Sequence, residues 1–501
     1  MTFIIDLLDG SDTVIGDGPL NNVLSVSIGE SLDQAGQIQF TLPATDYRAA
    51  TLLDQAVKFR VQFDDGTLVY GVLGGDTIDA TADQPTRVVQ GFDLLAELGG
   101  KSIGWWCYYE ASDINTVILP DLLAGTGWTT GTIEAGLGNF TQRFDGDSRL
   151  AALIKLTQQL NGKHFRRGSG LRVLDFGSFG TLAASEAINV HHVLHGQAAN
   201  AAIMIIGSLQ LTSDRAAVVH RIYPWGAGND NGDTNRFKAS LWYLPFADSR
   251  WSEIGITYGV RGAATSVTAV GADGHEYQTA DTSGFMEWPI QQLAWVTDPD
   301  DLTQPFGYNF VVDTIDTDAA LWVRGSPLLP GAPGNPIPAP TTFPVTVYGN
   351  PQLYLQTADY DPAAPREAVI IFNDVKAFSS SASDLAAIAP QLFERAKRYL
   401  LTHAVPQRSY AMTVVNAPYT LRVGDKLRVR YRGAVTRRGV TVDWIDVDEE
   451  LYLINITRTT NSDGTTNAVL EVSNIDAQPL DDVGALADGS SQVSAMAVNA
   501  S

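Results

Sequence analysis

The chain has 501 residues, of which 45% are hydrophobic, and its 33 basic and 56 acidic residues give a formal net charge of −23. Such a length predicts about two to four domains, each with a core of its own. The acidic excess argues against a nucleic-acid-binding surface, because such surfaces neutralise phosphates with Lys and Arg.

The cysteine content and the lengths of the apolar runs exclude further classes of protein. Cys107 is the only cysteine, which excludes an intramolecular disulfide framework and leaves stability to cores and partners. The opening MTFIIDLLDG lacks the basic region and cleavage site of a signal peptide. No run approaches about 18 uninterrupted apolar residues, so we expect no transmembrane segment. We expect a protein made in a reducing cytoplasm.

Residues 1–100 are predicted to form a small antiparallel β-barrel. VLSVSIGE and GQIQFTLP alternate between apolar and polar residues. VKFRVQF follows, with Phe59 and Val61 on one face and Lys58 and Arg60 on the other. Asp65-Gly66 supplies a hairpin turn, and RVVQGFDLLAEL closes the region as a strand that leads into a short helix.

The next two regions have different characters. Residues 101–200 are predicted to be an α/β insertion, because ASDINTVILPDLLAG and DSRLAALIKLTQQLNG have helical periodicity and HFRRGSGLRVLDFG resembles a hairpin. Residues 201–380 are predicted to be a β-rich middle region with a Pro-rich linker at 325–346.

Residues 381–475 are predicted to form a long helix, SASDLAAIAPQLFERAKRYLLTH, and a second β-barrel that follows it. Residues 476–501 form a small, polar, aromatic-free tail, which we expect to be ordered only by a partner. The predicted fold class is therefore α+β, mainly β, with two related antiparallel β-barrels.

The stretch LRVGDKLRVRYRG alternates strictly between apolar and basic residues, with Arg428, Arg430 and Arg432 on one face. It matches TLLDQAVKFRVQF in character, and in both places a second strand, a polar turn and a closing strand follow in the same order. This order favours an internal duplication. The alternative is that any two β-barrels share such alternation.

Five segments have strand-and-turn patterns in common with a known family. They are FTLPATDYRAATLL, RVVQGFDLLAEL, VVHRIYPWGAG, YTLRVGDKLRV and YLINITRTTNSDGTTNAVLEVS. They resemble phage tail hub proteins, the family of baseplate and tail-tip hubs that includes the N-terminal part of tail-associated lysins, and the resemblance covers about residues 1–230 and 380–475. Residues 231–365 have no match in it, and no lysozyme, peptidase or spike domain is recognised.

The resemblance implies a structural virion protein at the distal end of the tail, assembled in the host cytoplasm, and no enzyme. Such hubs are homotrimers whose two barrels per chain make a pseudo-sixfold ring, a symmetry adaptor that caps the tail tube and lines the channel for DNA ejection. The implied partners are tail tube proteins above, the C-terminus of the tape measure protein, and a tip, spike or fibre protein below. No sequence-specific nucleic-acid binding is implied, because DNA only passes through the lumen.

Within such a ring, we hypothesise that the basic residues of the two barrels lie outside the lumen and pair with carboxylates of a neighbouring subunit. The candidate interface residues are Lys58, Arg60, Arg428, Arg430 and Arg432. The alternative is that they form the solvated outer face of each barrel.

Candidate chemical sites are weak, so no catalytic residue, metal ion or cofactor is predicted. His191, His192 and His195 lack the following Glu and the third ligand of a zinc site. The loop 229–235, NDNGDTN, lacks the terminal Glu of an EF-hand, and Cys107 is expected to be a buried small apolar residue.

The rival function is a polysaccharide-binding or polysaccharide-cleaving tail protein that recognises host surface glycans. Stacking on sugar rings would fall to exposed tryptophans. The candidates are Trp105, Trp106, Trp242, Trp251, Trp288 and Trp295. Release of reducing ends from host cell wall would distinguish this function from a hub.

Overall fold

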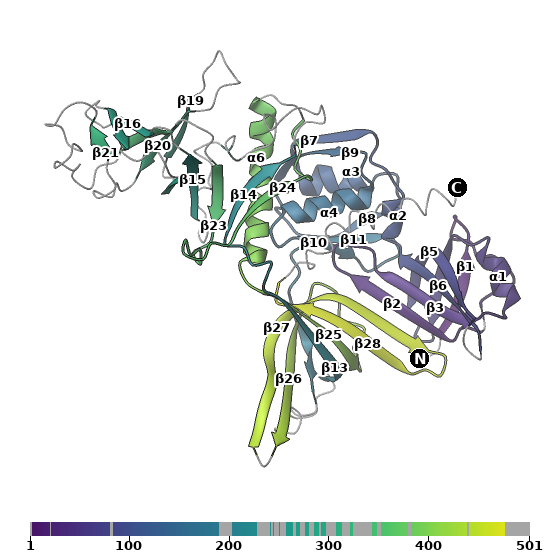
Figure 1. Cartoon of the computed structure of the whole chain (residues 1–501). Helices are drawn as coiled ribbons and strands as arrows, with labels where there is room; N and C mark the ends of the chain where they lie inside the picture. The colour runs from purple at the N-terminus through teal and green to yellow at the C-terminus, as the bar shows by residue number, and fades with distance from the viewer. Residues whose placement is uncertain are drawn as a thin grey trace. The chain divides into compact units, whose positions relative to one another are not determined.

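The computed structural model describes residues 3–20, 22–80, 84–189, 203–227, 352–378, 382–437 and 440–475, with a few single residues and short strands between 241 and 347. The chain forms two compact units, one of Met1–Ala217 with Pro406–Ser501 and one of Val218–Val405. Strands account for 49% and helices for 17% of the structure, which confirms an α+β, mainly β fold (Figure 1).

The first unit is built on a 12-stranded sheet that divides into two sets of six strands. The first set has the spatial order β1-β4-β5-β6-β3-β2, with every neighbouring pair antiparallel. A short helix, α1 (Tyr47–Leu53), connects β3 to β4. The strands are β1 (Phe3–Leu8), β2 (Ser25–Ser31), β3 (Gln37–Pro43), β4 (Lys58–Phe63), β5 (Leu68–Asp79) and β6 (Thr86–Asp93).

The second set has the same spatial order as the first when the six strands of each set are numbered along the chain. Its spatial order is β12-β26-β27-β28-β25-β13, and β12 and β13 pair to close it as a barrel. Its first strand runs in the opposite sense, because β12 is parallel to both of its neighbours whereas β1 is antiparallel to β4. The strands are β12 (Leu182–Ile188), β13 (Ile203–Asp214), β25 (Gln407–Val415), β26 (Lys426–Arg437), β27 (Val440–Asn461) and β28 (Thr466–Ser473).

The hydrogen-bond registers of the two sets also agree. The first residue of β4, Lys58, lies opposite Val72, and the first residue of β26, Lys426, lies opposite Tyr452. One residue further along β5 and β27, their ladders with β6 and β28 shift register at a bulge, after Leu73 in β5 and after Leu453 in β27. A bulge in the same place is a specific backbone feature, so the two related barrels predicted from the alternation are a true structural repeat.

Each set buries the apolar face that the alternation predicts. In the first set Phe59 and Val61 are fully buried, and in the second Leu427 and Val429 are. The Phe40 and Phe59 rings meet edge to face at 5.4 Å. In the first set, the described residues include no β1–β2 pair; instead, isolated bridges join β1 to Val14 and Leu20.

The insertion between the two sets has its own core of helices and short sheets. Ser148 caps α4 by accepting a hydrogen bond from the Ala151 N–H at 3.1 Å. A π-helical turn, Ile114–Ile118, precedes α3. The elements are α2 (Ala96–Gly99), β7 (Trp106–Asp113), α3 (Leu119–Leu123), β8 (Thr129–Ile133), β9 (Asn139–Asp145), α4 (Arg149–Gln159), β10 (His164–Arg167) and β11 (Val173–Gly177).

The second unit lies in the sequence between β13 and β25, and the long helix predicted beside the second barrel belongs to it as α6 (Ala382–His403). α6 packs on β14 and β23 of a five-stranded sheet. No helix in the described part of the chain is long and apolar enough to cross a membrane. The strands are β14 (Arg221–Gly226), β15 (Thr257–Ala263), β16 (Val267–Val270), β17 (Glu276–Thr279), β18 (Phe285–Pro289), β19 (Gln292–Val296), β20 (Gly307–Val312), β21 (Leu321–Val323), β22 (Phe343–Val347), β23 (Gln352–Gln356) and β24 (Glu367–Phe372).

The close packing of Phe59 against glycines predicts which glycine of β5 can accept a larger side chain. A Cβ at Gly71 would lie 2.3 Å from Cζ of Phe59, whereas a Cβ at Gly75 on the same strand meets no atom within 4 Å. We expect Gly71→Ala to lower the free energy of unfolding by about 1–3 kcal/mol through overpacking and Gly75→Ala to change it by less than about 0.5 kcal/mol. Urea unfolding measures both, and equal effects would contradict this packing.

Candidate functional site

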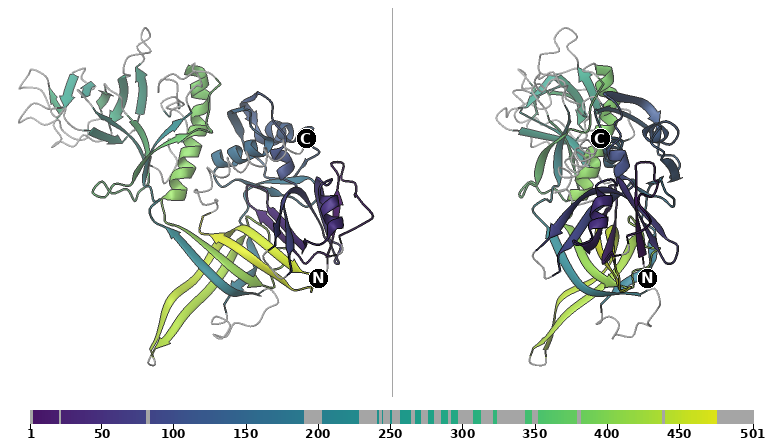
Figure 2. Two further views of the ribbon diagram at one scale, coloured as in Figure 1. Left: turned by 45° about the vertical axis from the view of Figure 1, so that its right-hand side comes forward. Right: turned by 90° about the vertical axis from the view of Figure 1, so that its right-hand side faces the viewer.

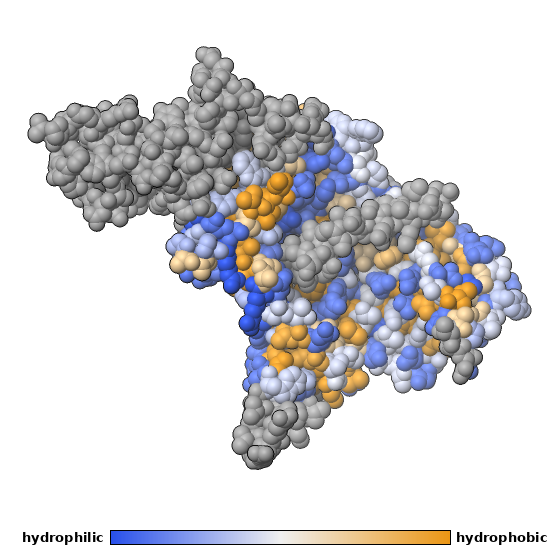
Figure 3. All heavy atoms as spheres, in the orientation of Figure 1, coloured by the Kyte–Doolittle hydropathy of each residue, from blue (hydrophilic) through white to orange (hydrophobic). Residues whose placement is uncertain are grey.

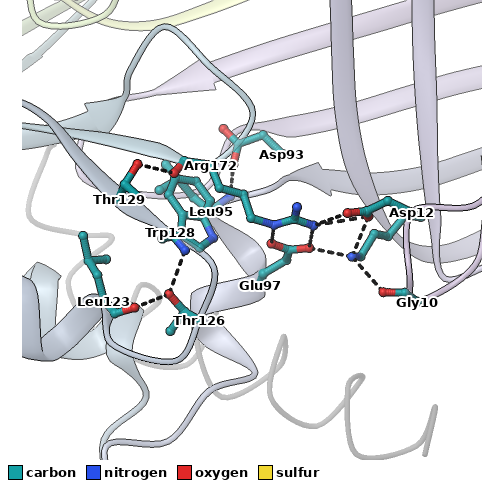
Figure 4. A network of polar contacts seen from close by, with 11 residues as sticks. Gly10, Asp12, Asp93, Leu95, Glu97, Leu123, Thr126, Trp128, Thr129 and Arg172 are labelled. Carbon is teal, nitrogen blue, oxygen red and sulfur yellow. Dashed lines mark hydrogen bonds and ion pairs between the residues drawn. The ribbon is translucent and has the colours of Figure 1, made fainter.

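Lys58, the first of the predicted interface residues, is buried within the chain, with 8% of its surface exposed. Its ammonium group donates to Asp12 at 2.8 Å and to the carbonyl of Gly10 at 3.3 Å, and it pairs with Glu97 at 2.9 Å. The apolar face of β4 packs into the barrel, while Lys58 points at α2 and at the loop after β1. Figure 4 shows its partners Gly10, Asp12 and Glu97 close together beside Arg172.

Arg172, in the turn between β10 and β11, completes this cluster. Its guanidinium group binds Glu97 with two hydrogen bonds of 2.6 and 2.8 Å and pairs with Asp12 at 2.9 Å. Burial acts to raise the pKa of both carboxyl groups, but Lys58 and Arg172 outweigh it and hold the pKa of Asp12 and Glu97 below their ordinary values. The cluster joins the first barrel to the insertion.

Arg60 also has a partner in its own barrel. Asp6 lies directly opposite it in the β1–β4 register, and the carboxylate accepts from the guanidinium at 2.6 Å. Asp6 is 5% exposed, so this pair is shielded from solvent more than a typical surface ion pair.

The arginine row of β26 faces a matching acidic row on β27. In the hairpin register Arg428 lies opposite Glu450, and Arg430 lies opposite Asp448. Arg428 pairs diagonally with Asp448 at 2.9 Å, and its guanidinium holds the pKa of that carboxyl below its ordinary value.

Arg430 and Arg432 continue the row. Arg430 pairs with Glu186 of β12 at 3.1 Å and with Asp448 at 3.4 Å, and Arg432 lies opposite Asp446. The signal for these partners was present in DWIDVDEE, where Asp446, Asp448 and Glu450 lie at every second position. Arg428 and Arg430 thus bind carboxylates of their own chain and Arg432 lies opposite one, while pairing with a neighbouring subunit stays a prediction.

The two barrels are joined by a strand pair that the sequence did not predict. All seven residues of β2 lie opposite residues of β27, from Ser25 facing Asn461 to Ser31 facing Asn455. The Ser27 and Thr459 hydroxyls hydrogen-bond across this pair at 2.7 Å. We call this pair the seam; it makes the two sets one continuous sheet.

A second unpredicted contact ties the insertion to the first barrel. His164 of β10 is 2% exposed, and its Nδ1 lies 2.6 Å from a carboxylate oxygen of Asp33 in the β2–β3 turn. The other oxygen of Asp33 accepts from the Phe165 N–H at 2.7 Å. Asp33 has a positive φ of 61°, a conformation that Asp tolerates better than most residues. No local pattern pairs residues so far apart in the sequence.

The other predicted site residues are scattered. His191, His192, His195 and the loop 229–235 lie outside the described residues, as do Trp242 and Trp251. The described residues contain no cluster of three or more potential metal ligands.

The remaining candidates lie in the insertion and the middle region. Cys107 is half-buried against the insertion core. Trp105 is 90% exposed and Trp106 51% exposed. Trp288 and Trp295 lie on β18 and β19, whose side chains the structure does not describe.

No protein-family model and no curated protein matches the chain. Among solved structures it is similar to the 43 kDa tail protein of prophage MuSo2 from Shewanella oneidensis, with 11% identity, a TM-score of 0.46 and coverage of 94% of this chain and 98% of that one. It is similar to prophage tail protein gp18 from Listeria monocytogenes EGD-e, with 10% identity, a TM-score of 0.44 and coverage of 97% and 99%.

A third similar structure is the E. coli c3393 protein, a component of the type VI secretion system, with 8% identity, a TM-score of 0.38 and coverage of 90% of this chain and 73% of that one. The structural neighbours are thus phage tail and tail-related proteins, the class that the sequence resembles.

The buried cluster and the exposed row predict different responses to loss of one cation. Lys58→Met leaves two carboxylates to Arg172 alone, and we expect it to lower the free energy of unfolding by about 2–4 kcal/mol. Arg428→Met removes a solvent-exposed pair and should leave the urea midpoint unchanged, because such pairs contribute little. Equal losses in urea unfolding would contradict the assignment of Lys58 to a buried cluster.

The burial of Asp93, at the end of β6, predicts that the stability of the protein depends on pH. Burial raises its pKa to about 6. Its folded-state pKa therefore exceeds the unfolded value, and its stabilising contribution is complete below about pH 4 and lost as the pH rises through about 6. An Asn oxygen can still accept the Leu95 N–H that Asp93 now accepts at 2.9 Å.

We therefore expect Asp93→Asn to gain stability relative to the unsubstituted protein, by up to about 3 kcal/mol, between about pH 4 and about pH 8. Urea unfolding of both proteins across this range measures the difference. Taking the difference cancels the opposite pH trend of Asp12 and Glu97. A difference that does not change with pH would contradict the raised pKa.

Proposed function

We propose that this protein is a structural component of a phage tail, a hub that assembles as a homotrimer into a pseudo-sixfold ring at the distal end of the tail tube. The observation that carries the proposal is the repeat itself. One chain holds two six-stranded sets with the same strand order and the same bulge, joined edge to edge in one sheet.

A chain of this kind presents the same architecture twice to its surroundings. Three copies arranged head to tail place six related barrels around one axis, which adapts a sixfold tube to a threefold tip. Closed rings are favoured because they leave no sheet edge open to uncontrolled pairing. The net charge of −23 supports a channel for DNA, since like charge keeps the polymer from adhering to the wall.

The candidate interface residues keep their role within this proposal. The Arg428 side chain is 39% exposed, so a carboxylate of a neighbouring subunit can approach it beside Asp448. Arg60, Arg430 and Arg432 are proposed for the same contact. Lys58, which is buried, contributes by holding the first barrel on the insertion. Tail tube proteins above, the tape measure C-terminus, and a tip, spike or fibre protein below complete the proposed partners.

Native mass spectrometry and negative-stain imaging of the full chain test the proposal. We expect a trimer whose averaged images show a ring with six lobes, and incubation with host cell wall should release no reducing ends. A chain that stays monomeric at high concentration would overturn the ring. Release of reducing ends would favour the glycan-cleaving alternative, for which the exposed Trp105 and Trp106 are the candidate stacking residues.

A further inference from the structure

The seam exists because β27 extends beyond its first partner. Its pairing with β26 ends at Tyr452, and over residues 455–461 the edge that β26 leaves is taken by β2. The other edge of the same stretch pairs with β28. β27 is the fifth strand of its set in chain order and β2 is the second strand of the other set, so the seam is a contact between strand five and strand two.

The first set has an equivalent strand five with the same edge bare. The pairing of β5 with β4 ends at Val72, the counterpart of Tyr452. Beyond the shared bulge, residues 75–79 correspond to 455–459 of β27, with Ile78 in the place of Arg458. They pair with β6 on one side only, and no described strand lies on the other. All five of these residues are exposed.

The second set has an equivalent strand two, β13, with a bare edge as well. Leu211 corresponds to Ile28. Leu211 lies opposite Tyr410 of β25, and Ile28 lies opposite Ile38 of β3. Tyr410 and Ile38 in turn occupy equivalent positions opposite β28 and β6. β12 covers the outer edge of β13 only as far as Ile205, and no described strand covers it beyond. Residues 210–213 are exposed. Figure 3 shows apolar side chains gathered on the second barrel.

We infer that β13 of one copy pairs antiparallel with β5 of the next copy, in the register of the seam within the chain. That register places Leu211 opposite Ile78, since their counterparts Ile28 and Arg458 are opposite one another. The inference rests on the proposed ring and names the strands that close it. Each copy carries one strand of each kind, so the contact is head to tail and repeats around the axis.

The residues that would meet are complementary. Leu211 is 42% exposed and Ile78 is 51% exposed, and pairing them buries two aliphatic side chains that water now covers. In the same register Thr212 meets Thr77. Gln210 meets Asp79, whose carboxylate can accept from the amide as Ser27 and Thr459 hydrogen-bond within the chain.

The acidic residues of the two edges do not oppose each other. In the inferred register Asp76 meets Ser213 and Asp214 meets Gly75. Like charges directly opposite one another would destabilise the pair, and this register has none. Asp76 also pairs with Arg87 of its own barrel at 2.9 Å. The edges are therefore suited to each other in an otherwise acidic chain.

Engineered cysteines test the register. Directly opposite residues of an antiparallel pair have Cα atoms about 4.5–5.5 Å apart, within the range of about 4.4–6.8 Å that a disulfide spans. In a Cys107→Ser background, the full chain with Ile78→Cys and Leu211→Cys should yield a covalent trimer on mild oxidation. The matched control joins Ile78→Cys with Ile205→Cys, which is exposed on the same strand but about 20 Å along it, and should yield none.

Native mass spectrometry of the reduced proteins separates the two proposals. Trimers that do not cross-link through residues 78 and 211, or that cross-link equally through 78 and 205, would overturn the pairing of β13 with β5 and leave the ring standing. Monomers in every protein, the unsubstituted one included, would overturn both.

A pair of charged variants gives an independent readout. Ile78→Lys with Leu211→Lys places like charges opposite each other, and we expect it to raise the concentration at which half the chain is monomeric by about tenfold or more. Ile78→Lys with Leu211→Glu should restore assembly to within about threefold of the unsubstituted chain. Equal assembly of the two variants would contradict the register.

Discussion

The hydrogen-bonded seam between β2 and β27 is the constraint on which the first unit depends. Backbone N–H and C=O groups along a strand edge require partners, and β27 provides them to three strands at once, β26, β28 and β2. Because its partner changes from β26 to β2 along one edge, β27 belongs to both sets. The orientation of one set against the other is therefore fixed by main-chain geometry, with side chains adding to it.

The side-chain charges reinforce this arrangement at sites with different degrees of burial. Lys58 and Arg172 neutralise Asp12 and Glu97 where four elements meet, and there the removal of one charge would leave another buried without compensation. β26 and β27 form a long hairpin (Figure 2). Its Arg428 and Asp448 side chains are 39% and 46% exposed, so solvent screens the pair. The same alternation of apolar and basic residues thus serves a structural joint in one barrel and a solvated ladder in the other.

Strand alternation predicted much of this fold and little of its connections. VKFRVQF and LRVGDKLRVRYRG were matched correctly as β4 and β26, since burying one face of a strand imposes period two on the sequence. The carboxylates opposite the arginines were readable in DWIDVDEE, but only with the hairpin register known. The contact between Asp33 and His164 and the seam itself join residues distant in sequence, and no local pattern encodes such pairings.

The reversed first strand is the main difference between the two sets, and it shows which strands have to be the same in both. β12 runs parallel to β13 and closes the second set, whereas β1 is antiparallel and pairs instead with the segment containing Val14 and Leu20. The two sets are therefore closed differently, and a ring built from them would alternate between two kinds of barrel. Strands two and five, which make the seam, keep their place in the strand order in both sets, and strand five keeps its bulge in both. Divergence of the first strand is tolerated because that strand takes no part in joining one barrel to the next.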